Sequence, residues 1–423
     1  MSFPLIFSII VVIATIYALI KRYEARLVLI TSGIVMAIAS LQPMVAFQQF
    51  DKSMTNSALI IAICSAMGFA ASVSLTKCDV HLVALLTRPL KSLGFMLLPA
   101  CMLVTSLCSV AIPSTAGLCA AVGPSMIPIL IRAGFKPVIA ATAIVASTTP
   151  ALFNPGVSHN VFIAKMANME VMELIRHVSP ALLGFSLATI IGITVMCLIY
   201  RDYKKPQPGE ATVEQAETLA NNLPERVNIL YALAPLVPIF ILLYVSLFTS
   251  LKMSVATAMI IGTVYAIAVT RTNPAKVTKE FFNGMGKGYA DILGIIIAAG
   301  VFAAGLKAAG VVDLLVKTLT SANELARAGG AFGPYLMGLL TGSGDAAAFA
   351  FNEAVTPHAT QFGMTIPSLG YLAVVSGALG RLSSPLAGGL ILVAGIAAVS
   401  PMDIVKRTIP VMLVLLLGAY FFF

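Results

Sequence analysis

Residues 366–399 read IPSLGYLAVVSGALGRLSSPLAGGLILVAGIAAV, an apolar stretch whose one charged side chain is Arg381. The stretch is longer than the roughly 20 residues with which a helix crosses a hydrocarbon core of about 30 Å. The segment Gly380-Arg381-Leu-Ser-Ser-Pro385 interrupts it, and a proline removes a backbone donor and opens the preceding helical turn. The sequence therefore predicts a membrane helix that is broken near its middle, with a guanidinium group at the break.

The rest of the chain has the same apolar character. Of its 423 residues, 59% are hydrophobic and 10% are charged, and the mean hydropathy is +0.98. A soluble protein carries roughly 25% charged residues. Residues 178–200 and 229–250 contain no charged side chain at all. The composition therefore predicts an all-α, polytopic membrane protein whose surroundings are lipid.

The net charge of +9 does not indicate a nucleic-acid partner. The basic residues gather in the predicted loops, where they set the topology because cytoplasmic loops are rich in Lys and Arg. The six cysteines show no paired metal spacing and mostly lie in apolar runs. We therefore expect reduced packing residues and no metal site.

The two halves of the chain resemble each other. Matching positions lie 229 residues apart and pair Ser114 with Ser343, Pro128 with Pro357 and Gly134 with Gly363. A repeat of this length predicts two structural repeats, at residues 1–200 and 229–423. The polar segment 201–228 between them is predicted to be a cytoplasmic linker.

Loop charge orients the two repeats in opposite directions. The apolar stretch at about 92–131 begins and ends at basic loops, so we expect a re-entrant hairpin that opens to the cytoplasm. The matching hairpin at about 331–356 is followed by a loop without Lys or Arg and should open outward. Each inverted repeat should hold about five transmembrane helices, one of them broken, and one re-entrant hairpin. The broken helices are predicted at about 137–168 and 366–399.

Polar side chains collect at the two hairpin tips and the two helix breaks. A charge at mid-membrane costs at least ~2.5–3.5 kcal/mol, so such charges mark functional sites. Helices that start at a break direct free N–H groups and a partial positive charge into the cavity, which suits carboxylates. The candidate substrate-binding residues are Ser114, Thr115, Thr149, Asn154, Ser158, Asn160, Ser343, Gly344, Arg381, Ser383 and Ser384, and the candidate coupling residues are Asp345, Glu353 and His159.

Structural explanations exist for the same residues. Small residues and prolines also permit close helix packing in membrane bundles. Arg381 could form a purely structural ion pair with Asp345 or Glu353, and the pair could also coexist with a substrate that competes for the arginine. His159 could be a hydrogen-bonded spacer.

Several stretches carry a family resemblance. They are Ser114-Thr-Ala-Gly-Leu118, Ala298-Ala-Gly-Val-Phe-Ala303, Thr341-Gly-Ser-Gly-Asp345 through Glu353, Leu379-Gly-Arg-Leu-Ser-Ser-Pro385 and Ile404-Val-Lys-Arg-Thr408. In these the chain resembles the DcuC family of anaerobic four-carbon dicarboxylate carriers, within the ion transporter superfamily. The resemblance implies exchange, efflux or ion-coupled symport of succinate, fumarate or malate. It also implies a homodimer in the bacterial inner membrane with elevator-type motion.

The chain departs from the family pattern at two places. The pattern has Asn where this chain has Asp345, and a Ser-Gly-Asp element where this chain has Ser158-His159-Asn160. An acidic residue is thus absent from one half and present in the other. These two departures bear on which substrate is carried and on whether Na⁺ or H⁺ is the coupling ion, and they do not bear on the transporter class.

Two other functions are compatible with parts of the sequence. One is a Na⁺/H⁺ antiporter or a carrier of another small organic anion. The other is an intramembrane enzyme, which needs a nucleophile with a base or a metal set. The chain has four histidines and no His-Glu-x-x-His spacing, so we expect no catalytic residues and no cofactor.

The predicted topology can be tested by labelling. Single cysteines at Lys136 and Gln361, in a background without native cysteines, should react from the cytoplasm and the periplasm respectively, because the two hairpins open to opposite sides. A membrane-impermeant maleimide applied to oriented vesicles measures the side. Reaction of both positions from one side would refute the inverted arrangement.

Overall fold

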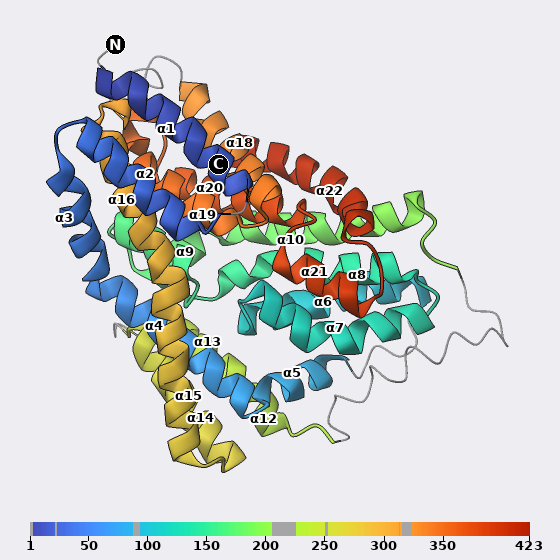
Figure 1. Ribbon diagram of the computed structural model, residues 1–423. Helices are drawn as coiled ribbons and strands as arrows, with labels where there is room; N and C mark the ends of the chain where they lie inside the picture. Colours follow the sequence, from blue (N-terminus) through green and yellow to red (C-terminus); the bar gives the residue numbers. More distant parts are fainter. Residues whose placement is uncertain are drawn as a thin grey trace.

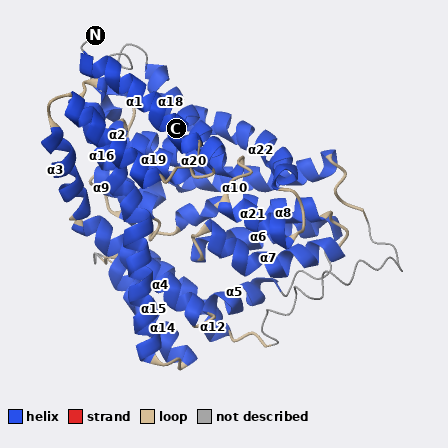
Figure 2. Ribbon diagram, in the orientation of Figure 1, coloured by secondary structure: helices blue, strands red, loops and turns tan. Residues whose placement is uncertain are grey.

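The predicted all-helical class is confirmed by a computed structural model. It describes residues 3–21, 23–87, 94–204, 226–249, 253–312, 314 and 323–423. Within these ranges nearly every residue lies in a helix or a short connection, and there is no strand (Figure 2). One isolated β-bridge pairs Phe135 with Tyr203.

Several helices are long and apolar enough to cross a membrane. The described residues contain five such helices, or up to seven if each of two bent helix pairs forms one span. The five are Gly94–Ala111, Pro137–Met166, Val171–Ile199, Pro274–Ala308 and Pro401–Phe422. A multi-pass membrane protein is therefore confirmed, whereas the number of spans in each half stays a prediction.

One group of helices comes from the start of each half. It contains α1 (Phe3–Ile20), α2 (Ala25–Ala39), α3 (Pro43–Met54), α4 (Ser57–Leu75), α13 (Val237–Phe248), α14 (Val255–Thr270), α15 (Pro274–Lys287) and α16 (Gly294–Ala308). Helix α16 packs on α2 and α3, and α15 packs on α4 (Figure 1). The segment α3–α4 therefore runs antiparallel to α15–α16.

Two helix pairs correspond to the predicted hairpins. The first pair is α6 (Leu97–Ala111) with α7 (Thr115–Arg132), and the second is α18 (Asn323–Thr341) with α19 (Gly344–Ala354). Helix α18 begins eight residues before the expected position 331. Its first turns, Asn-Glu-Leu-Ala-Arg-Ala, are rich in good helix formers, so the charged side chains do not end the helix. Residues 88–93, which include the predicted start of the first hairpin, lie outside the described part.

Two further helices are broken within the predicted stretches. The first is divided into α8 (Pro137–Ala146), the 3-10 turn η3 (Thr149–Phe153) and α9 (Ser158–Met166). The second is divided into α20 (Ile366–Leu382) and α21 (Gly388–Ile396). Each is followed by a long helix with an internal proline, α10 (Val171–Ile199) with Pro180 and α22 (Pro401–Phe422) with Pro410.

Short elements complete the fold. They are α5 (Cys78–Thr87), η2 (Gly94–Met96), α12 (Ile229–Leu233), η5 (Ala234–Leu236), the π-helical turn η6 (Gly288–Leu293) and η7 (Thr356–Phe362). Most of the predicted linker, residues 205–225, lies outside the described residues.

The first residues of that linker pack against the helices. Asp202 is fully buried and accepts two hydrogen bonds from Arg407, from Nε at 2.5 Å and from Nη2 at 3.0 Å. Lys136 adds an ion pair to the same carboxylate at 3.2 Å. A buried charge is tolerated when it is paired and hydrogen-bonded in this way. The pair ties the end of α10 to α22.

Glycines let the second hairpin lie directly on α20. A Cβ atom at Gly344 would collide with the carbonyl group of Gly377, and one at Gly377 would lie 2.7 Å from the Gly344 oxygen. Gly338 and Gly380 form equally close contacts between α18 and α20. Backbone approaches of this kind are typical of membrane helix pairs built from small residues.

The substitution Gly344→Ala should destabilise the protein by at least about 1–3 kcal/mol, because the added methyl group meets backbone that cannot rotate away. Gly395→Ala in α21 is the matched control, since no atom lies within 4 Å of its added methyl group. The unfolding temperatures of the two variants in detergent are measured by circular dichroism. Equal unfolding temperatures for the two variants would contradict the packing described here.

Candidate functional site

Both hairpin tips contact the break between α20 and α21. A methyl group at Gly342, in the tip of the second hairpin, would lie 2.7–2.9 Å from the backbone of Leu386 and Ala387. A methyl group at Gly389 would lie 2.6 Å from Cγ2 of Thr115, in the tip of the first hairpin. The two tips therefore meet at the start of α21.

Three charged or titratable side chains meet beside this break. Nε2 of His159 lies 3.1 Å from Oδ1 of Asp345, and Nη1 of Arg381 lies 3.9 Å from Oδ2 of the same carboxylate. His159 comes from α9, Asp345 from the first turn of α19 and Arg381 from the last turn of α20. The cluster thus joins the two halves of the sequence.

The carboxylate of the cluster is open on one side. The side chain of Asp345 is 51% exposed, whereas those of Arg381 and His159 are 23% and 8% exposed. Asp345 is therefore the accessible side chain of the cluster, and the arginine and the histidine lie mostly beneath the surface. We call the exposed side of Asp345 the opening.

Two buried polar atoms of the cluster have no partner among the described residues. They are Nε of Arg381 and Nδ1 of His159, and Oγ1 of Thr149, in the turn η3 of the first break, is another buried atom without a hydrogen bond. Most buried polar groups in proteins are hydrogen-bonded, so each exception calls for an explanation. The two nitrogens belong to the ion cluster, so the oxygen atoms of a ligand would supply the hydrogen-bond acceptors that these nitrogens lack.

The imidazole of His159 is held by an aromatic ring. It stacks on Phe349 of α19 with a centroid distance of 4.2 Å and an interplanar angle of 21°. Phe162 in turn packs edge-on against the Phe349 ring, with a centroid distance of 5.3 Å. The stacking fixes the plane of the imidazole and therefore the direction in which Nε2 faces Asp345.

Two predicted binding residues in the first break are engaged by the protein itself. Nδ2 of Asn154 donates to Val110 O in α6 at 2.7 Å, and its Oδ1 accepts from the N–H of Gly156. Nδ2 of Asn160 donates to the carbonyls of Leu152 and Asn154. Their side chains thus hold the shape of the break.

Tyr371 continues this network into α20. Its hydroxyl is fully buried and donates to Oδ1 of Asn160. Sequence reasoning did not select this residue. The available signal was a polar hydroxyl group in the interior of a predicted broken helix.

The serines of the second break are also bonded within the protein. Oγ of Ser383 donates to Leu379 O at 2.9 Å and accepts from the hydroxyl of Tyr335 at 3.1 Å. Oγ of Ser384 accepts from the N–H of Leu386 at 3.3 Å. Both serines are fully buried.

The remaining candidates lie at helix starts. Ser114 caps α7 by accepting from the N–H of Gly117 at 3.2 Å, and it is exposed. Thr115, Ser158 and Gly344 are the first residues of α7, α9 and α19, and Ser343 is the cap residue before α19. Helix starts carry partial positive charge, so these positions favour an anion nearby.

Glu353 lies apart from the cluster. It follows Asp345 by eight residues on α19, which corresponds to roughly 12 Å along a helix. The structure therefore does not bring this coupling candidate to the opening that Asp345 lines.

The described residues contain no group of three or more His, Cys, Asp or Glu side chains placed to hold a metal ion. The chemistry available at the opening is therefore that of one guanidinium, one imidazole, one carboxylate and several helix starts. This set can bind an anion and exchange a proton.

Comparison with protein families gives one match over nearly the whole chain. The family model described as DcuC, C4-dicarboxylate anaerobic carrier, matches residues 3–423. The DcuC anaerobic C4-dicarboxylate transporter of Escherichia coli K12 is 28% identical over 368 residues, which cover 84% of this chain and 77% of that protein. An uncharacterised transporter of Haemophilus influenzae is 45% identical over 276 residues, which cover 63% of this chain and 98% of that protein.

Two solved structures share the fold. The YdaH transporter of Alcanivorax borkumensis aligns with a TM-score of 0.61 at 17% identity, over 89% of this chain and 86% of that one. MtrF of Neisseria gonorrhoeae, from a class of antimetabolite efflux pumps, aligns with a TM-score of 0.64 at 12% identity, over 89% and 81%. At these identities the likeness concerns the fold alone.

Proposed function

The chain belongs to the DcuC family of C4-dicarboxylate anaerobic carriers, and from this membership we propose that it carries succinate, fumarate or malate across the bacterial inner membrane. The family and the relatives are transporters and not enzymes. The observation that supports the substrate class is the buried Nε of Arg381, which lacks a hydrogen-bond partner within the described part of the chain while Nη1 of the same guanidinium lies 3.9 Å from Asp345. A planar guanidinium offers a carboxylate two parallel hydrogen bonds.

The geometry supports a particular binding mode. One substrate carboxylate would take two hydrogen bonds from the Arg381 guanidinium, one of them from the unpartnered Nε, and would lie toward Nδ1 of His159, the other buried cluster nitrogen without a partner. The other carboxylate would lie toward the starts of α7 and α19, where Ser114, Thr115 and Ser343 present neutral donors. Those residues, with the helix starts behind them, are the proposed substrate site.

Asp345 is the proposed coupling residue. It already lies 3.9 Å from Arg381, so an incoming carboxylate competes with it for the same cation. Two ionised carboxylates that share one site repel each other. A proton or Na⁺ that neutralises Asp345 would therefore favour substrate binding, and exchange, efflux and symport would all use this step. Glu353 and His159 are the other coupling candidates.

The packing also supports the inverted repeat and its motion. A hairpin, a broken helix and a long proline-containing helix follow one another in both halves, residues 1–200 and 229–423. The antiparallel contact of α3–α4 with α15–α16 agrees with opposite orientations. We propose that the hairpins and broken helices move together against this contact in an elevator-type cycle, within a homodimer.

Substitution of Arg381 tests the substrate class. Arg381→Lys should lose most of its affinity for succinate, because a single ammonium cannot form the two-bond fork. Loss of one charged hydrogen bond is worth about 1.5–3 kcal/mol. The affinity is measured from the uptake and exchange of labelled di- and tricarboxylates by proteoliposomes. Arg176→Lys is the control, because Arg176 is exposed on α10.

Two results would contradict the proposal at different levels. Near-normal succinate affinity of folded Arg381→Lys protein would show that the arginine does not bind the substrate. Proton exchange driven by a Na⁺ gradient, with no organic anion carried by the wild type, would indicate a Na⁺/H⁺ antiporter instead.

Substitution of Asp345 tests the coupling. Asp345→Asn should retain succinate exchange but lose stimulation by an inward proton gradient, because the amide keeps the shape of the side chain and cannot take up the proton. Succinate exchange and its stimulation are both measured by proteoliposome uptake with and without an inward proton gradient. Asp291→Asn is the matched control, since Asp291 is 69% exposed and pairs with Arg26 at 3.7 Å in another part of the molecule.

Equal gradient stimulation of the wild type and Asp345→Asn would exclude Asp345 as the coupling residue. His159 and Glu353 would then be substituted in the same assay. A loss of exchange as well as stimulation would mean that Asp345 is required for binding or folding.

A further inference from the structure

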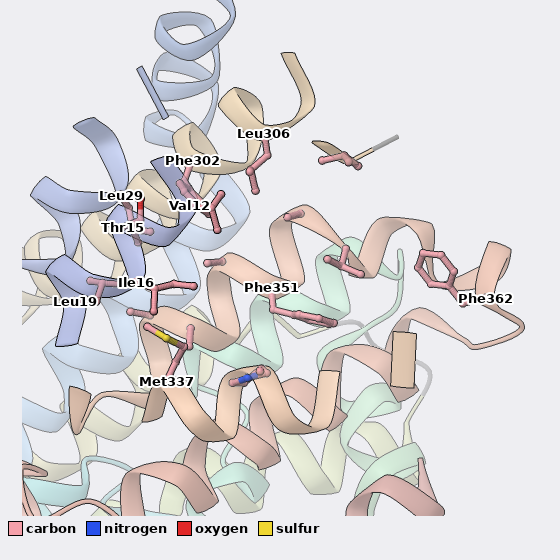
Figure 3. Close-up of a pocket in the computed structure, with 18 residues that line it drawn as sticks. Val12, Thr15, Ile16, Leu19, Leu29, Phe302, Leu306, Met337, Phe351 and Phe362 are labelled. Carbon is pink, nitrogen blue, oxygen red and sulfur yellow. The ribbon is translucent and has the colours of Figure 1, made fainter. Parts of the chain in front are cut away.

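A cavity lies beside the second hairpin, and none of the three ion-cluster residues lines it. Its volume is about 240 Å³, and its walls come from α1, α2, α16, α18, α19 and the residues that follow α19. Figure 3 shows Val12 and Ile16 of α1 facing Met337 of α18 and Phe351 of α19 across this space.

The walls of the cavity are apolar. The hydroxyl of Thr15, a polar side chain among them, is already used in hydrogen bonds to Val11 O at 2.8 Å and to Oγ of Ser32 at 2.6 Å. Alanines at 346, 350 and 354 line the α19 side, and their short side chains leave the space open. Water does not fill a cavity without polar partners, and an apolar cavity of ~150 Å³ is known to accept benzene.

The cavity is open at the surface between α1 and α18. Ile16 at its edge is 40% exposed, Gly333 is exposed, and a methyl group at Gly333 would meet no atom within 4 Å. The neighbouring side chains of Phe332 and Leu336 are 41% and 51% exposed. In a membrane protein such exposed apolar side chains face lipid, so the opening of the cavity is continuous with the lipid-facing surface.

We infer that this cavity binds an acyl chain of a membrane phospholipid. An acyl chain is apolar like the cavity walls, and in the bilayer it is present at the exposed edge formed by Ile16 and Gly333. A helix of a second copy is about 10–12 Å wide with its side chains, which is too wide for a space of this volume. The acyl chain would replace the dispersion contacts that an empty cavity loses.

The bound chain would have a mechanical effect on the second hairpin. Ala346, which lines the cavity, directly follows Asp345, which lines the ion cluster. Helix α19 therefore separates the two spaces, and movement of α19 away from the cluster is movement into the cavity. An acyl chain in the cavity opposes that movement and holds Asp345 against His159.

Tryptophan fluorescence can test the binding, because the chain contains no tryptophan. The full-length Phe351→Trp protein is reconstituted in phosphatidylcholine vesicles with or without bromine atoms on the acyl chains, which quench tryptophan on contact. Phe349→Trp is the control on the same helix, since Phe349 is 1% exposed and stacks on His159. Phe332→Trp is the control that faces lipid.

Brominated chains should quench the Phe351→Trp protein severalfold more than the Phe349→Trp protein and about as strongly as Phe332→Trp. Adding Gly333→Leu, which narrows the opening, should abolish quenching of Phe351→Trp while Phe332→Trp stays quenched. Quenching of Phe351→Trp no greater than that of Phe349→Trp would overturn the inference, whether the cavity is empty or covered by a second copy. Undiminished quenching after Gly333→Leu would overturn the proposed path between α1 and α18.

Discussion

The backbone contact between Gly344 and Gly377 is the constraint on which the geometry of the ion cluster depends. Helix α19 can begin against α20 only because neither position carries a side chain. Asp345 follows Gly344 directly, and Arg381 lies one helical turn after Gly377, so the same contact brings the backbones of the two charged residues together. The packing thus places the Asp345 carboxylate within reach of Arg381, whose Nη1 lies 3.9 Å from it.

Helix breaks inside a membrane expose backbone groups that must be satisfied within the protein. The structure divides this task among the polar residues. Asn160 donates to two carbonyls at the first break, Asn154 connects the break to Val110 O of α6, and Tyr371 connects the network to α20. The atoms that stay unpartnered in the ion cluster belong to Arg381 and His159, at the opening. Polar groups that maintain the fold are therefore distinguishable from those available to a ligand.

Local chemistry explains which features could be predicted from the sequence. Both breaks lie within the predicted stretches, because proline and glycine act on their own turn and need no partner. Contacts between distant segments could not be predicted. His159 and Asp345 are 186 residues apart and meet only through the packing of α9 beside α19 and α20. Asp202 lies in a polar stretch, which predicts exposure to solvent. In the structure it is fully buried and accepts a hydrogen bond from Arg407, 205 residues away.

The charges of the cluster limit how the proposed carrier could work. Arg381 and Asp345 together are neutral, and a dicarboxylate would add two negative charges to a cavity of low dielectric. An unpaired buried charge costs several kcal/mol even after the protein relaxes. A loaded site is therefore favoured when cations accompany the substrate, and His159 and Asp345 are the groups at the opening that can take up protons. Because Asp345 and His159 come from different halves of the chain, protonating the Asp345 carboxylate would also weaken the contact between the halves. Substrate charge and the movement of the second hairpin would thus be linked through a single carboxylate.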